Sequence, residues 1–248
     1  LGAARLVFPA QMRRSGAASH RAASSCLRRN RCMSTPAQVT VSPARLWASR
    51  LVRIAVVVLV IAAEISIIVE VGPAFEPVNH YSYFTVLSNI FGAVVLAVAL
   101  ARPVPDVLRG AAVTYLGLTG IVYNTMLRGI DVQTPGFANE VLHVIVPILM
   151  VADWILAPPT VRITGRHILI WMAAPIAYLV YTLIRGPFVD WYPYPFLDPR
   201  PNGYLAVVIG SVLVALEFAL AAFVVAWTGN RLRALALSQA SSKASSAG

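Results

Sequence analysis

His143 is the residue of this sequence whose surroundings most demand a chemical explanation. It lies within the apolar stretch NEVLHVIVPILMVADW, residues 139–154, and no other long apolar segment contains a histidine away from its ends. Asn139 lies one helical turn before it and Pro147 one turn after it. Ionisable side chains are costly inside a membrane, and those that occur there usually serve a function. His143 is therefore the first candidate for a functional side chain.

The rest of the sequence argues against several kinds of histidine chemistry. Haem ligation needs two axial ligands at matching depth, and His80 and His167 fall in or beside loops on opposite sides. A zinc site also lacks ligands, because Cys26 and Cys32 both precede the first apolar segment. The serine-hydrolase pattern G-x-S-x-G is absent. We expect no cofactor and no metal.

A hydroxyl nucleophile with a histidine base remains, and Thr85 is a hydroxyl residue at the depth of His143. In this interpretation the Thr85 hydroxyl attacks an ester carbonyl while His143 takes up its proton. Asn89, Asn139 or Tyr181 could donate a hydrogen bond to the oxyanion that forms. The residues together predict a small polar site inside a membrane protein.

Six apolar segments must position these side chains. Hydrophobic residues make up 58% of the chain and charged residues 12%, about half the charged fraction of a typical soluble domain. A membrane-spanning helix needs about 20 apolar residues. The segments are residues 47–71, 83–101, 107–127, 137–157, 166–184 and 203–227. The sequence therefore predicts an all-α, polytopic integral membrane bundle of six transmembrane helices.

The placement of basic residues predicts the orientation of this bundle, because they concentrate on the cytoplasmic side. On the side of the N-terminal tail lie Arg45, Arg50, Arg53, Arg102, Arg109, Arg162, Arg166, Arg231, Arg233 and Lys243. On the other side lie Arg128, Arg185 and Arg200. Both termini are therefore expected to be cytoplasmic. The aromatic loop 186–203 is expected to lie on, or to cap, the outer membrane surface.

Polar side chains gather at the outer ends of four predicted helices. Each helix carries a pair spaced four residues apart, so both members share a helical face. The pairs are Thr85/Asn89, Asn124/Arg128, Asn139/His143 and Tyr181/Arg185. They predict a polar pocket open toward the outer leaflet, and an inner third poorer in polar groups. The guanidinium groups of Arg128 and Arg185 could bind a carboxylate or phosphate, and Glu64 could pair with one of them.

Polar tails are expected to flank the membrane domain of residues 46–230. Residues 1–45 are rich in Ala, Ser and Arg, which is typical of a disordered basic tail or an organelle transit peptide. An extension of the gene model ahead of a start at Met33 would also explain them. Residues 231–248 are expected to form a disordered cytoplasmic tail. The basic tail lacks interleaved aromatics, so nothing indicates nucleic-acid binding.

Three motifs give the chain a resemblance to a known family. YSYFTVLSN at residues 81–89, the stretch 139–154 and the loop WYPYPFLDP resemble the bacterial six-span proteins called Pr6Pr. These are similar to the androgen-induced and androgen-dependent membrane proteins of animals, and the resemblance covers residues 50–227. It implies an intramembrane threonine hydrolase acting on fatty-acid esters of hydroxy fatty acids, with Thr85 and His143 at the catalytic positions. Its substrates and partners would be lipids of a bacterial plasma membrane.

Two other functions remain open from the sequence. The chain could transport or bind an amphipathic anion held by Arg128 and Arg185, in which case polar groups should reach both membrane faces. It could also be a non-catalytic membrane subunit whose polar residues only join helices. In that case the removal of Thr85 or His143 should cost stability and little else. The sequence does not indicate an oligomeric state.

Overall fold

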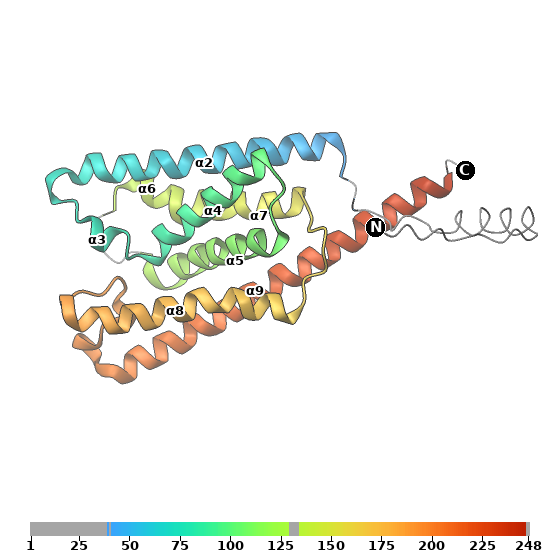
Figure 1. Ribbon diagram of the computed structural model, residues 1–248. Coiled ribbons are helices and arrows are strands. Elements are labelled where there is room, and N and C mark those ends of the chain that lie inside the picture. Colours follow the sequence, from blue (N-terminus) through green and yellow to red (C-terminus); the bar gives the residue numbers. More distant parts are fainter. Residues whose placement is uncertain (1–38, 40, 129–133, 247–248) are drawn as a thin grey trace, which may run out of the picture. The chain divides into compact units, whose positions relative to one another are not determined.

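The computed structural model describes residues 39, 41–128 and 134–246, and these residues form helices and no β-strand (Figure 1). The long helices are α2 (Pro43–Val71), α4 (Phe84–Ala101), α5 (Asp106–Val122), α7 (Val146–Leu156), α8 (Gly165–Val189) and α9 (Pro199–Ser246). Short elements join or extend them: η2 (Gly72–Ala74), α3 (Pro77–His80), η3 (Tyr123–Leu127), α6 (Gly136–Glu140), η4 (Val141–Ile145) and η5 (Pro195–Leu197). The elements η3 and η4 are π-helical.

Most of these helices are long and apolar enough to cross a membrane. Five segments of the described chain meet both criteria: Pro43–Ala74, Phe84–Ala101, Gly136–Leu156, Gly165–Val189 and Pro199–Ser242. The remaining predicted span corresponds to α5, which η3 continues to Leu127. The prediction of an all-α membrane bundle is confirmed. The chain is an α-helical integral membrane protein.

Helix α5 lies at the centre of the bundle. It packs against α4, α7 and α9, while α2 packs against α4 and α7. Helix α8 lies mainly against α9, and the two run side by side in Figure 1. Helix α2 begins and α9 ends at one end of this bundle, which we call the terminal end (Figure 1). The opposite end carries η2, α3 and η5 and is called the loop end.

Two helices extend beyond their predicted ends. Helix α8 continues to Val189 and α9 continues to Ser246. Residues 231–246 are therefore helical, and our expectation of a disordered tail there is wrong. The segment RLRALALSQA is rich in Ala, Leu and Arg, which have high intrinsic helix propensity. At the other terminus α2 begins at Pro43 behind the capping residue Ser42, whereas residues 1–38 lie outside the described residues.

A buried ionic cluster lies among the residues toward the terminal end, where we expected few polar groups. Asp153 is 1% exposed, and its carboxylate accepts hydrogen bonds from Ser49 and Arg53, both 2.7 Å, and from Arg109, 2.9 Å. Arg109 also contacts Asp106 at 3.4 Å. The cluster joins α2, α5 and α7. The expectation missed it because its members stand alone in sequence and meet only after the helices pack.

Close packing of α5 against α8 depends on Gly110. A Cβ atom built at Gly110 would lie 2.3 Å from the ring of Trp171, which is fully buried. We therefore expect Gly110→Ala to lower the free energy of unfolding by about 1–3 kcal/mol through overpacking. Gly117 is the matched control on the same helix, because a Cβ there meets no atom within 4 Å. Gly117→Ala should be neutral or stabilising in the same denaturation assay, and an equal loss in both variants would contradict the packing argument.

Candidate functional site

His143 lies on the π-helical turn η4 between α6 and α7. Pro147 follows it by four residues and has no N–H to donate to the His143 carbonyl, which a regular helix would require. The wider turn accommodates this missing bond, and such π-bulges are frequent at functional sites. Gly120 of α5 permits a close approach here, because a Cβ on it would lie 3.2 Å from the His143 carbonyl oxygen.

Hydrogen bonding fixes which nitrogen of His143 can act as a base. Nδ1 lies 3.0 Å from the Asn139 carbonyl oxygen. A carbonyl only accepts, so Nδ1 carries the proton and Nε2 of the neutral ring has the free lone pair. The ring stacks on Tyr123 with 4.3 Å between centroids. The Asn139 side-chain amide in turn donates to the Tyr123 hydroxyl, which holds the stacked pair in place.

Thr85 lies in the first turn of α4 and is 7% exposed. Its backbone N–H donates to the Tyr194 hydroxyl oxygen at 3.2 Å, and the two hydroxyl oxygens are 3.3 Å apart. Burial raises the pKa of the Tyr194 phenol. The phenol therefore keeps its proton at neutral pH. Because the Tyr194 oxygen already accepts from the Thr85 N–H, its proton is available for Thr85 Oγ1 or for a bound ester.

Asn89 connects the helix of Thr85 to that of His143. Its side-chain amide donates to the Thr85 carbonyl at 2.8 Å and to the Leu142 carbonyl at 3.1 Å. Both amide protons are thus committed to backbone oxygens. Asn89 therefore holds the two helices together, and our expectation that it could donate to an oxyanion does not fit this geometry.

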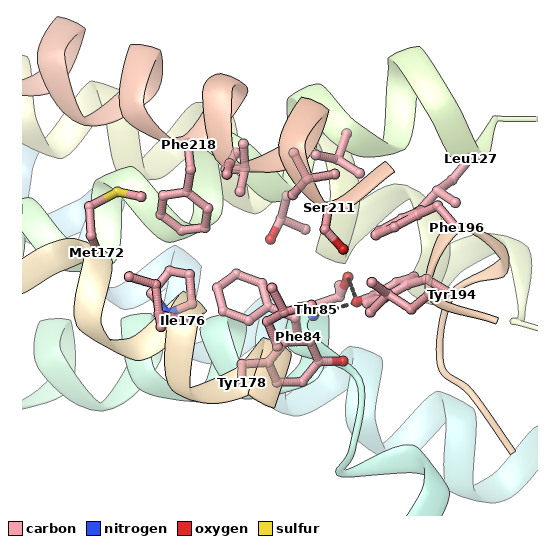
Figure 2. Close-up of a pocket in the computed structure, with 18 residues that line it drawn as sticks. Phe84, Thr85, Leu127, Met172, Ile176, Tyr178, Tyr194, Phe196, Ser211 and Phe218 are labelled. Atoms are coloured by element: carbon pink, nitrogen blue, oxygen red, sulfur yellow. Dashed lines mark hydrogen bonds between the residues drawn. The ribbon is translucent and has the colours of Figure 1, made fainter. Parts of the chain in front are cut away.

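Thr85 and His143 line the same pocket at the loop end. The pocket has a volume of about 280 Å³. Its polar and aromatic walls are Phe75, Glu76, Asn79, His80, Tyr83, Thr85, Tyr123, Thr134, Asn139, His143, Trp191 and Tyr194. Of the eight residues that the sequence analysis selected, the pocket lining includes three, namely Thr85, Asn139 and His143. Thr85 and Tyr194 also line a second, apolar cavity (Figure 2).

Two selected residues of α8 have other contacts. Arg185 donates to the Asn79 side-chain oxygen at 2.7 Å and stacks over Trp191. The Tyr181 hydroxyl lies 3.0 Å from the Ser82 hydroxyl. Neither lines the pocket of Thr85 and His143. They attach α8 to the segment before α4, and the proposed roles in oxyanion or head-group binding do not follow from their positions.

The second predicted rim arginine, Arg128, lies on the exposed surface. It contacts the Asn124 side-chain oxygen at 3.3 Å, and the Asn124 amide donates to the Gly120 carbonyl. Neither Asn124 nor Arg128 lines the pocket. Glu64 pairs with His80 at 2.9 Å, so the expected pairing of Glu64 with an arginine is wrong. The physical reason is that α3 lies over the end of α2 and presents His80 to the carboxylate.

Sequence reasoning missed Tyr194 as a site residue. The loop before α9 carries several aromatic residues, and their composition predicts only a place at the membrane interface. Tyr194 is the aromatic residue that turns inward and bonds to Thr85. Its ring also stacks on Phe196, with 5.2 Å between centroids. A single sequence contains no signal that separates Tyr194 from its neighbours.

The fold and the site together define an α-helical membrane protein in which the Thr85 hydroxyl and the His143 imidazole belong to residues that line one pocket. Within the described residues no group of three His, Cys, Asp or Glu side chains is placed to hold a metal ion. Comparison with models of protein families, with curated proteins and with solved structures finds no match to this chain.

Proposed function

We propose that the protein hydrolyses lipid esters, with Thr85 as the nucleophile and His143 as the general base. One observation carries this proposal: Thr85 lines both a polar pocket that contains His143 and an apolar cavity. An ester with an acyl chain needs this pair of environments, since its carbonyl lies between an apolar tail and a more polar remainder. The resemblance of residues 81–89 and 139–154 to intramembrane threonine hydrolases gives additional support.

The reaction needs two successive acyl transfers. His143 Nε2 takes the Thr85 hydroxyl proton as Oγ1 attacks the ester carbonyl, and the tetrahedral intermediate collapses to an acyl-threonine. The proton leaves with the alcohol product. Water, activated by the same nitrogen, then releases the acid and restores Thr85.

Two groups are available to stabilise the oxyanion. Tyr194 can donate its phenol proton. The first turn of α4 presents backbone N–H groups that have no partner within the helix, including that of Val86, whose residue is on the pocket wall. Donors of this kind typically contribute about 10²–10³-fold to the rate.

The alternative of an anion transporter has less support. It requires free guanidinium groups near the pocket, but Arg185 is bonded to Asn79 and Arg128 lies outside the pocket. Toward the terminal end, Arg53 and Arg109 are committed to Asp153. By analogy with the bacterial proteins of the resemblance, we expect the reaction to take place in a bacterial plasma membrane.

Site mapping with an alkyl fluorophosphonate tests the proposal. The full chain in detergent micelles should be phosphonylated at one hydroxyl, and mass spectrometry of its peptides should place the adduct on Thr85. Ser211 provides an internal comparison, because its hydroxyl also faces the apolar cavity (Figure 2). An adduct on Ser211, or a folded protein that does not react, would show that Thr85 is not the activated nucleophile.

A further inference from the structure

The apolar cavity beside Thr85 has a nearly uniform hydrocarbon wall. It lies between α4, α5, α8 and α9 and has a volume of about 110 Å³, well above the roughly 10–15 Å³ that one water needs by the same measure. Two of the hydroxyl groups on its wall are committed to backbone carbonyls, since Thr119 donates to Tyr115 and Tyr178 donates to Ser82. An apolar cavity of this kind favours an apolar guest over water.

The cavity is elongated along the helix axes. Figure 2 shows Met172 and Phe218 toward one end and Leu127 and Phe196 toward the other, with the contact between Thr85 and Tyr194 between these ends. Ser211 and Phe218 both line the wall from α9, and seven residues of helix correspond to roughly 10 Å. At roughly 1.2 Å per bond of an extended chain, that depth holds about eight carbon atoms.

One wall of the cavity lies at the lipid-facing surface between α8 and α9. Ile176 of α8 lines the cavity and is 56% exposed, and Ala215 of α9 is also both lining and exposed. Pro175, beside Ile176 on the same wall, removes one backbone hydrogen bond from α8. The cavity thus reaches side chains that are exposed on the surface of these two helices.

We propose that this cavity is an acyl-chain channel, which a single unbranched chain enters from the bilayer between α8 and α9. The chain lies with its tail toward Met172 and Phe218 and its carbonyl toward Thr85. The Ser211 hydroxyl, buried without a hydrogen-bond partner, is available to the oxygen atoms of the substrate. The part of the inference that concerns the reacting carbonyl rests on the proposed hydrolysis, whereas chain binding does not.

Photocrosslinking of a fatty acid with a terminal diazirine tests chain binding without catalysis. The probe is added to the full-length Thr85→Ala protein in detergent micelles, and adducts are mapped by mass spectrometry. We expect adducts near Met172 and Phe218. Val214→Phe should fill the channel and lower adduct yield by at least about tenfold, as a misfit in an apolar pocket does. Val212→Phe is the matched control, because Val212 is exposed on the same helix and does not line the cavity.

Chain-length preference tests the depth of the channel in the catalytic protein. Met172→Ala should shift the preferred p-nitrophenyl ester toward longer chains, and Val214→Phe toward acetate. Equal adduct yields in the Val214 and Val212 variants, or adducts confined to lipid-facing residues, would overturn the channel. Specific adducts in a protein that hydrolyses none of the esters would leave the channel standing and refute the proposed hydrolysis instead.

Discussion

Replacing Thr85 by alanine is expected to abolish ester hydrolysis, and replacing His143 by alanine should slow it by about 10²–10⁴-fold. The first change removes the attacking oxygen, and the second removes the base that takes up its proton. Because nucleophile and base act as one unit, the double variant should be no slower than Thr85→Ala alone. Thr85→Ser should retain activity. Initial rates with p-nitrophenyl octanoate in detergent micelles measure all four variants.

Thr125→Ala is the matched control for these rates. Thr125 lies at the same end of the bundle, is exposed, and donates only to the Ile121 carbonyl, so its removal should leave hydrolysis unchanged. Thermal unfolding of each variant separates chemistry from folding. If Thr85→Ala and His143→Ala lowered the melting temperature but left the rate at the level of the control, both residues would be structural and the hydrolase proposal would fail.

Asp153→Ala is expected to lower the free energy of unfolding by about 3–5 kcal/mol, because it leaves buried cations without their counter-ion. Arg53 and Arg109 both donate to this carboxylate and are themselves largely buried. Arg109 keeps only its 3.4 Å contact with Asp106 and its bonds to backbone carbonyls. Unfolding by detergent titration in mixed micelles measures the loss.

Asp190→Asn provides the comparison for this loss, because asparagine removes the charge and tolerates the left-handed backbone of Asp190 at φ 48°. Asp190 also pairs with an arginine, Arg200, at 2.7 Å, but its side chain is 87% exposed. Exposed ion pairs contribute little to stability, so this variant should unfold close to the wild type. Similar losses in both variants would mean that burial does not determine the contribution of Asp153, and that the cluster is not a stabilising core of the terminal end.

Helical spans are the part of this protein that a single sequence predicts well. Long apolar segments separated by Pro and Gly are local features, and the six predicted segments correspond to α2, α4, α5 with η3, α6 to α7, α8 and α9. The same local reasoning selected Thr85 and His143, since helix direction and depth follow from position along each segment. It failed at residues 231–246, where we predicted a disordered tail from the polar composition although the segment contains residues of high helix propensity.

Contacts between distant segments needed the tertiary structure. Tyr194 and Thr85 are 109 residues apart, and Arg109 and Asp153 are 44 apart, so no spacing rule connects them. The sequence analysis placed polar residues only by their depth in the membrane, and depth does not say which face of a helix a residue occupies. It therefore assigned Asn124 and Arg128 to the pocket, whereas the rotation of their helix places them outside it.

The sequence by itself determined that the chain is a membrane bundle and that a threonine and a histidine lie at one level of it. Periodicity and hydropathy are properties of consecutive residues, so the sequence records them directly. Only the tertiary structure decided that His143 and Thr85 share a pocket, and that an apolar cavity adjoins Thr85. Both features depend on how each helix is rotated and packed. Helix rotation and packing result from many weak contacts between residues that are distant in the sequence.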